Sequence, residues 1–430
     1  MNRNVLSYLT LLLSGFCLTA NYGIIRPAMD SLFLVHFDAT DRLWGMAALP
    51  VLVTLLLWPY NFALARFGAR RTVAGSTALS GACLLVPGLL LSDWAVRLVP
   101  AIASYDGLLK SAAFGGYLIK EVYMVFLVEQ FWSFATSSNT VEGGKKYFGG
   151  LLIMGGLGGM AGNKAQALLA TSVGTAEMTL LALLLLVPFW LLISTAYTLS
   201  PAQGRLRPKG GEREVGVGIR QLLTSRYLVL IALVVGLGQM MVACLDVVFH
   251  DKVLAAYPAL DQRSVFLADV WFYINGGATL MQIVTPVVLR LFSVRILHIV
   301  LPVSHLATVG ASLAFPFLAT AAFAFAWFKA VDYSLFRACK DLLYVPLDFS
   351  ARYRVKMLID FVIYRSTKAT TALALAALRS LSLVSLAFFP VVALAAAAVW
   401  VAAGASLGSQ FSKLASRSAD EASDDDLRRR

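Results

Sequence analysis

Long apolar stretches separated by short polar interruptions run along almost the whole chain. A helix needs about 20 predominantly apolar residues to cross the hydrocarbon core of a bilayer, which is roughly 30 Å thick. Twelve stretches reach this length, so the pattern predicts an all-α membrane protein with twelve transmembrane helices. Their expected spans are 5–25, 43–64, 73–92, 113–137, 147–172, 177–200, 226–249, 264–290, 295–316, 318–345, 355–378 and 383–404.

The longest polar interruption divides these stretches into two sets. Residues 201–225 are rich in Gly, Pro and Arg, and six apolar stretches lie on each side of them. We therefore expect an N-terminal six-helix half at 1–200, a cytoplasmic linker at 201–225 and a C-terminal six-helix half at 226–405. The remaining residues, 406–430, are polar and mixed in charge, which predicts a disordered cytoplasmic tail.

This two-half layout resembles the major-facilitator-like carriers, in which the substrate site lies between the halves near the bilayer midplane. The loop after the second span is consistent with the resemblance. Its residues 66–71 read Arg-Phe-Gly-Ala-Arg-Arg and are similar to the basic end of the loop motif of that superfamily. The aspartate that usually precedes this segment is replaced by Ala65.

The composition agrees with a membrane protein. Of the 430 residues, 59% are hydrophobic and 14% are charged, and the mean hydropathy is +0.75. A soluble protein of this length is far less apolar. No small-residue cleavage site follows the first apolar stretch, so we expect a membrane span there and not a signal peptide.

The net charge of +12 follows the topology. Basic residues gather in alternate loops, which is the positive-inside pattern and predicts that both termini are cytoplasmic. We therefore do not expect nucleic-acid binding, although the charge also attracts acidic solutes toward the inner mouth. The basic loops contain Arg66, Arg70 and Arg71; Lys145 and Lys146; Arg205, Arg207, Lys209, Arg213 and Arg220; Arg290 and Arg295; and Arg352, Arg354 and Lys356. The loops on the other side contain mainly acids, among them Asp30 and Asp261, with a few basic residues such as Arg42, Arg97 and Arg263.

The sequence offers no sign of redox, metal or catalytic chemistry. The four cysteines fall in four different predicted spans, without the paired spacing of a disulfide or a metal site. The metalloprotease motif H-E-x-x-H is missing from the sequence. We therefore expect neither an enzyme nor a cofactor.

The tenth span carries the densest set of ionisable groups. Charged side chains at membrane depth are costly and normally face a bundle interior or a watery path. With about 100° of rotation per residue, Lys329, Asp332, Phe336 and Lys340 share one face of a helix, and Arg337 lies nearer the side. The alternative interpretation is a pair of internal salt bridges that lock helices together.

Other spans add single candidates. Glu121 of the fourth span shares a helix face with Trp132, which suits proton or substrate handling. Asp246 is the lone carboxylate inside the seventh span, whereas His250 is expected at its rim as a solvated histidine. In the first span, Arg26 precedes a proline and either caps the helix or projects into the cavity.

The eighth and eleventh spans complete the set. Asn275 lies beside aromatic residues that either stack on a planar ligand or form a membrane-interface belt. Asp360, Tyr364 and Thr367 share a face of the eleventh span, near the cation Lys368. The fifth span is rich in glycine, and we expect close helix packing there and not a phosphate loop, because no Gly-Lys is followed by Ser or Thr.

Two motifs resemble the nucleotide transporter family of plastids and intracellular bacteria, the ATP/ADP translocases. The family pattern K-x-x-K-Y-S-L-F-D-P-x-K-E-M-A-Y-I-P-L-D is matched at Lys329, 333–336, Lys340, Tyr344 and 346–348. A second match covers 131–135, 140–142 and 145–147, which are similar to F-W-G-F-A-N and T-V-x-E-A-K-x-F-Y. Weaker similarity covers 26–32 and 246–252.

The resemblance implies exchange of ATP for ADP, or import of nucleoside triphosphates, by a divergent bacterial member in the inner membrane. It carries over Glu121, Asp246 and Lys340 as transport residues, with Asp246 where the family usually has glutamate. The family lysine after the first span is Met29 here, Asp332 stands for a lysine, and Arg337 stands for an aspartate. Either Arg337 compensates for the missing cation or the ligand is smaller or less anionic.

The sequence thus predicts a monomeric carrier of a small anionic solute, a nucleotide, that works by alternating access. Lys340, Lys329 and Arg337 are the expected phosphate partners, and Glu121 and Asp246 the gating or coupling carboxylates. The remaining candidates for substrate binding are Asp332, Tyr333, Asp360, Tyr364, Lys368, Arg26, Trp132 and Asn275. The alternatives are a proton-coupled exporter or symporter of another anionic metabolite, such as a siderophore or a sugar phosphate, and a membrane enzyme or assembly partner without transport.

Overall fold

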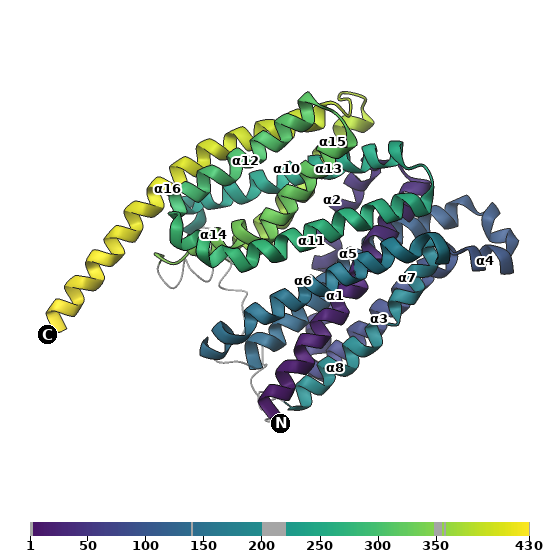
Figure 1. Cartoon of the computed structure of the whole chain (residues 1–430), viewed down its shortest axis with the longest axis horizontal. Coiled ribbons are helices and arrows are strands. Elements are labelled where there is room, and N and C mark those ends of the chain that lie inside the picture. Colours follow the sequence, from purple (N-terminus) through teal and green to yellow (C-terminus); the bar gives the residue numbers. More distant parts are fainter. Residues whose placement is uncertain (1–2, 139–140, 200–220, 348–354, 357, 430) are drawn as a thin grey trace. The chain divides into compact units, whose positions relative to one another are not determined.

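The computed structural model describes residues 3–138, 141–199, 221–347, 355–356 and 358–429 (Figure 1). Within these ranges every regular element is a helix. The chain divides into two compact units, Met1–Lys209 with Val253–Thr279, and Gly210–Lys252 with Leu280–Arg430. Two of the three unit boundaries therefore fall inside helices, one in α10 (Arg226–Ala256) and one in α11 (Leu260–Leu291).

The first unit contains all the described helices that come before the linker. Its elements are α1 (Arg3–His36), η1 (Ala39–Asp41), α2 (Arg42–Phe67), α3 (Ala69–Leu90), α4 (Asp93–Leu98), η2 (Pro100–Ser104), α5 (Asp106–Ser138), α6 (Val141–Val173), α7 (Thr175–Leu183) and α8 (Leu186–Leu199), together with the adjoining parts of α10 and α11.

The second unit contains the remaining parts of α10 and α11 and the helices that follow. These are α12 (Val294–Ala314), α13 (Leu318–Val331), the π-helical segment η3 (Asp332–Phe336), α14 (Arg337–Leu342), the π-helical segment η5 (Leu358–Ile363), α15 (Tyr364–Ser380) and α16 (Phe388–Arg429). A π-helical turn holds one residue more than the α-helical hydrogen-bond spacing, and such turns occur frequently at functional sites.

The predicted fold class is confirmed, since the described chain is all-α and multi-pass. Among the described residues, nine helical segments are long and apolar enough to cross a membrane. The other three predicted spans, 147–172, 318–345 and 355–378, lie on α6, on α13 through α14, and on η5 with α15. Residues 201–220 of the predicted linker lie outside the described residues, and α16 continues as a helix to Arg429 through the predicted tail.

Helix α1 is the centre of the first unit. It packs against α5, α6, α7 and α8, and its contact with α6 is the longest (Figure 1). Ile25 of α1, Leu127 of α5 and Phe189 and Ile193 of α8 are completely buried in the core of this unit. Because lipid tails are as apolar as these side chains, their close packing, and not transfer out of water, holds the helices together.

Glycines let the backbones of α1 and α6 approach closely, as the fifth predicted span suggests. A Cβ atom at Gly162 would lie against the carbonyl oxygen of Ala20, and one at Gly158 against that of Phe16. On the α1 side, a Cβ atom at Gly23 would come within 2.6 Å of the carbonyl oxygen of Gly159. Small residues thus serve as the contact surface, which is a common way of packing helices in membranes.

The core of the second unit is aromatic. Trp400 of α16 is 1% exposed and packs against His305 of α12, with ring centroids 5.4 Å apart, and against Phe336 of η3 at 5.2 Å. Phe328 of α13 completes the cluster, 5.0 Å from His305. These contacts fix α12, α13, η3 and α16 relative to one another.

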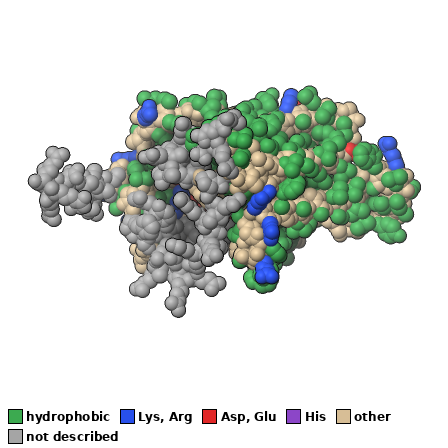
Figure 2. Space-filling model, turned by 90° about the horizontal axis from the view of Figure 1, so that it is seen from below, with side chains coloured by type: hydrophobic (Ala, Val, Ile, Leu, Met, Phe, Trp, Pro, Cys, Tyr) green, Lys and Arg blue, Asp and Glu red, His purple; other side chains and the backbone are tan. Residues whose placement is uncertain are grey.

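Large apolar side chains are exposed on the outer surface of the helices. Figure 2 shows hydrophobic side chains over much of the visible face, with a few separate basic ones. On α2, Leu55 is 67% exposed and Trp58 is 78% exposed. In water such a surface would drive aggregation, so its presence is consistent with a lipid-facing helix.

The α1–α6 contact gives a stability prediction. Gly162→Ala places a methyl group against the Ala20 carbonyl, and we expect a loss of about 1–3 kcal/mol from overpacking. Gly149→Ala is the control on the same helix, because a Cβ atom there meets nothing within 4 Å. The melting temperature in detergent should fall for Gly162→Ala only, and equal stability of the two variants would contradict the packing described.

Candidate functional site

A chain of four charges, three of them buried, links α1, α2 and α5 in the first unit. The Asp30 carboxylate accepts a hydrogen bond from Nη1 of Arg42 at 2.9 Å, and Nζ of Lys120 lies 3.2 Å from the same oxygen. Lys120 also donates to Oε1 of Glu121 at 2.6 Å. Asp30 and Lys120 are each 1% exposed and Arg42 is 3% exposed. Each of the buried charges Asp30, Arg42 and Lys120 therefore has a partner of opposite sign, which is the condition for burying it.

Arg26 lies at the end of this chain of charges. Its guanidinium is 3.6 Å from the ring centroid of Trp271 and 4.8 Å from that of Tyr22, and Nη2 is 4.0 Å from Oε1 of Glu121. Tyr22 donates from its hydroxyl to the same Glu121 oxygen at 3.3 Å. Because α1 continues through Pro27 to His36, Arg26 does not cap a helix, and that alternative is wrong.

Lys120 was not among the predicted site residues, and three nearby charged residues lie inside the protein and not in the loops where they were predicted. Asp30, Arg42 and Arg263 were assigned to exterior loops, but all three are buried, and Arg263 is 1% exposed with Nη2 donating to the Ser31 carbonyl at 2.9 Å. α1 and α2 extend further than the apolar pattern predicts, so residues that look like loop charges lie inside the fold. A lysine next to Glu121 in an apolar run was the available signal for Lys120.

The second unit gathers the candidates of the tenth and eleventh spans around the two π-helical segments. Lys340 of α14 donates to Oδ1 of Asp360 in η5 at 2.6 Å. Tyr364, the first residue of α15, donates to Oδ2 of Asp332 in η3 at 3.4 Å. The side chains of Lys340 and Asp360 are 12% and 30% exposed, so the pair remains accessible to a solute.

Lys329 and Arg337 flank this group. Lys329 is 8% exposed, with Nζ 5.5 Å from the Tyr333 ring centroid and 5.8 Å from that of Phe325. Arg337 is exposed. Phe336, expected on the same face as Lys329 and Lys340, instead points into the core against Trp400, because the π-helical turn changes the register of the residues that follow.

A histidine and a carboxylate form a buried pair on α10. Nδ1 of His250 lies 3.1 Å from Oδ1 of Asp246 and 2.8 Å from the Asp246 carbonyl oxygen. His250 is 1% exposed and Asp246 is 7% exposed. The expectation of a solvated histidine is therefore wrong, because α10 runs beyond the predicted span to Ala256 and keeps this turn inside the protein.

Three further candidates, Trp132, Asn275 and Lys368, lie on α5, α11 and α15. Trp132 belongs to an aromatic cluster, with ring centroids 5.6 Å from Phe131 and 5.8 Å from Phe148. Asn275 of α11 faces Gly159 of α6 within the first unit. Lys368 is half-buried on α15, one turn after Tyr364. In the part of the chain that the structure describes, no group of three or more His, Cys, Asp or Glu side chains could hold a metal ion.

The arrangement of helices is found in proteins of known structure. The fold resembles solved transporters, among them a bacterial homologue of the iron transporter ferroportin in an inward-facing state (TM-score 0.69, 13% identity, 94% of this chain and 98% of that chain) and the nucleoside transporter NupG (TM-score 0.60, 11% identity, 96% and 99%). The D-xylose-proton symporter is similar as well (TM-score 0.59, 13% identity, 91% and 96%). The predicted major-facilitator-like fold is thereby confirmed.

Comparison of sequences shows which transporters this chain is similar to. Residues 279–411 match the family model "TLC ATP/ADP transporter". The chain is 28% identical over 235 residues to ADP,ATP carrier protein 1 of Arabidopsis thaliana chloroplasts, covering 49% of this chain and 37% of that protein, little more than a third of its length. It is 23% identical over 425 residues to ADP,ATP carrier protein 1 of Chlamydia muridarum, covering 84% and 79%. The resemblance noted in the sequence is confirmed: the chain is a divergent relative of ATP/ADP carriers, which are transporters and not enzymes.

The buried charges of the first unit give a second prediction. Asp30→Asn leaves Arg42 and Lys120 without the carboxylate between them, and we expect a loss of about 3–5 kcal/mol in folding stability. Asp106→Asn is the control, because the Asp106–Lys110 pair is at the surface, with side chains 69% and 48% exposed. Chemical unfolding in detergent measures both, and a small effect at Asp30 would mean that the buried charges are not balanced as described.

Proposed function

We propose that this protein is a membrane carrier of nucleotides that exchanges ATP for ADP, or imports nucleoside triphosphates, by alternating access. The observation that carries the proposal is the accessible Lys340–Asp360 pair beside the π-helical segments, within the residues that match the ATP/ADP transporter family. We further propose that the protein lies in the bacterial plasma membrane with both termini in the cytoplasm and acts as a monomer.

A phosphate group can take the place of Asp360 as the partner of Lys340. A nucleoside triphosphate carries three to four negative charges, and these need paired cations in a site of low dielectric. When the nucleotide is absent, Asp360 satisfies Lys340 at 2.6 Å. When the nucleotide arrives, its phosphate competes for the same ammonium group. Exchange of one anion for another keeps the lysine neutralised throughout.

Arg337 and Lys329 extend the proposed phosphate site. Arg337 is exposed, and its planar fork suits bidentate contact with phosphate oxygens. Lys329 lies over aromatic rings and can approach an anion at little cost in side-chain freedom. The hydroxyl of Tyr364 holds Asp332 by a hydrogen bond of 3.4 Å, and we propose that Asp332 orients the neighbouring cations.

In the first unit, Lys120 can supply the cation that Met29 does not. A Cβ atom at Gly116, one turn before Lys120 on α5, would come within 2.8 Å of the Met29 sulfur, so Lys120 lies one turn from the position where the family has a lysine. We propose that Glu121, which contacts Lys120, Tyr22 and Arg26, is the gating carboxylate of this unit. A change of its partner during transport would be transmitted to α1 through Arg26.

The buried Asp246–His250 pair supports a second candidate function. A carboxylate and an imidazole 3.1 Å apart inside a membrane helix can hold and release a proton. A proton-coupled exporter or symporter of another anionic metabolite would use such a pair. The two candidates differ in what drives transport, a counter-nucleotide in the first and a pH gradient in the second.

Labelled ATP uptake tests the phosphate site. In liposomes containing the protein, Lys340→Ala should abolish uptake, because the ammonium that faces the phosphate is lost. The single variant also leaves Asp360 without its partner, which could destabilise the fold. The double variant Lys340→Ala with Asp360→Asn has no such unpaired carboxylate and should still be inactive. Its inactivity would therefore report lost binding and not lost folding. Lys110→Ala, at an exposed lysine of the other unit, is the control. Normal uptake by the Lys340 variant would exclude Lys340 from the mechanism.

The driving force separates the two candidates. Liposomes loaded with ADP should take up ATP without a pH gradient, and empty liposomes should not take it up even when a gradient is imposed. His250→Gln should leave ADP-driven uptake within about twofold of the parent. Uptake that needs the gradient and is lost in His250→Gln would instead support the proton-coupled carrier.

A further inference from the structure

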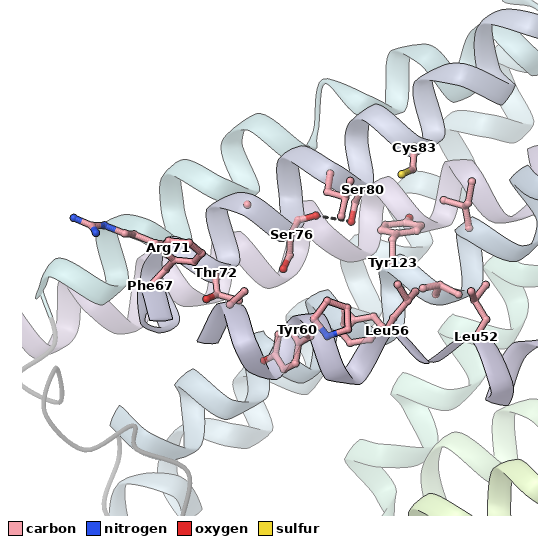
Figure 3. Close-up of a pocket in the computed structure, with 17 residues that line it drawn as sticks. Leu52, Leu56, Tyr60, Phe67, Arg71, Thr72, Ser76, Ser80, Cys83 and Tyr123 are labelled. Carbon is pink, nitrogen blue, oxygen red and sulfur yellow. Dashed lines mark hydrogen bonds between the residues drawn. The ribbon is translucent and has the colours of Figure 1, made fainter. Parts of the chain in front are cut away.

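A long apolar groove lies between α2, α3 and α5 in the first unit (Figure 3). Its volume is about 460 Å³, within the usual range of ligand pockets in proteins. Leu52, Leu56 and Pro59 of α2 line one wall, and Ile119, Val122 and Phe126 of α5 line another. The groove is distinct from the charged groups described above.

Three of the hydroxyl groups along the groove already donate hydrogen bonds within the protein. The hydroxyl of Thr72 donates to the Gly68 carbonyl at 2.9 Å, and that of Ser80 donates to the Ser76 carbonyl at 2.7 Å. Tyr123 donates to Oδ1 of Asn21 on α1 at 2.8 Å. These three hydroxyls are therefore not available as hydrogen-bond donors to a ligand. The mainly apolar lining of the groove suits a hydrocarbon chain better than a nucleotide or a sugar.

One end of the groove is basic. Arg71 belongs to the lining and is exposed, and Figure 3 shows its side chain extending away from the apolar part. Arg66 and Arg70 are also exposed, on either side of the tight turn at Gly68, whose φ is +77°. Arg71 thus stands at one end of the apolar groove, and Arg66 and Arg70 are its neighbours in the sequence, around the loop that the charge pattern assigns to the cytoplasmic side.

The length of the groove matches one leaflet. On α3 the lining runs from Arg71 to Cys83, twelve residues, or about 18 Å at 1.5 Å per residue. Half of the hydrocarbon core is roughly 15 Å thick. An acyl chain whose headgroup lies at the arginines would therefore reach about the middle of the bilayer.

We propose that this groove binds an anionic phospholipid of the cytoplasmic leaflet, with one acyl chain between α2, α3 and α5 and the phosphate at Arg71, Arg66 and Arg70. Basic pockets at the cytoplasmic ends of membrane helices bind acidic headgroups, and an arginine fork suits a phosphate. The lipid fills an apolar space that would otherwise leave α2 loosely packed, since few of its membrane-depth side chains are buried. The lipid is a structural ligand, separate from the transported solute.

Purified protein stripped of lipid tests the proposal. Phosphatidylglycerol should raise the melting temperature more than phosphatidylcholine with the same acyl chains, and native mass spectrometry should detect one retained phosphatidylglycerol. Arg71→Gln should weaken this binding roughly tenfold and bring the two lipids to equal effect. Arg97→Gln, at another exposed arginine, should change nothing.

A second variant tests the acyl chain separately. A Cβ atom at Gly75 meets nothing within 4 Å, so Gly75→Leu can fill the groove without a clash. It should remove the stabilisation by either lipid while leaving the lipid-free protein as stable as the parent. Stabilisation by glycerol phosphate equal to that by phosphatidylglycerol, unchanged lipid preference in Arg71→Gln, or full lipid binding in Gly75→Leu would each overturn the proposal.

Discussion

Neutralisation of buried charge is the constraint on which this structure depends. A membrane protein can bury ionised side chains only if each has a partner, because desolvation costs several kcal/mol per ion. Asp30 meets this condition for two cations at once, at 2.9 Å from Arg42 and 3.2 Å from Lys120. The same requirement joins Lys340 to Asp360 in the other unit. Each proposed functional group is thus also a structural one, and its partner decides how readily it can be released to a solute.

The order of the helices along the chain follows from the apolar pattern, because each predicted span lies on one or more observed helices, and the glycines of α6 pack as their clustering suggests. The ends of the helices do not follow from this pattern. Hydropathy falls at the first charged residues, so it ends the first span near Arg26, whereas the helix continues to His36 and carries Asp30 into the core. A buried, paired charge and a solvated loop charge look the same in a sequence, since the difference lies in a partner on another helix.

The grouping of the candidate side chains in the second unit was predicted only in part, because the sequence does not reveal where a helix departs from regular α-helical geometry. Lys340, Asp360, Asp332 and Tyr364 come together as expected from their faces, but Phe336 does not join them. Reading faces at 100° per residue presumes a regular α-helix, and η3 and η5 are π-helical. Lys120 could have been noticed beside Glu121, whereas its link to Asp30 depends on the packing of α1 against α5, which only the folded chain reveals.

The Lys340–Asp360 pair has a consequence for energetics in a live cell. Moving one elementary charge through the membrane potential takes about 2.3 kcal/mol per 100 mV. A lysine and an aspartate joined at 2.6 Å have no net charge, so any motion of α14 and η5 that keeps them together transfers none across the bilayer. The voltage therefore exerts no net force on this pair while it stays joined, and the pair itself would contribute electrical work only if Lys340 and Asp360 were separated.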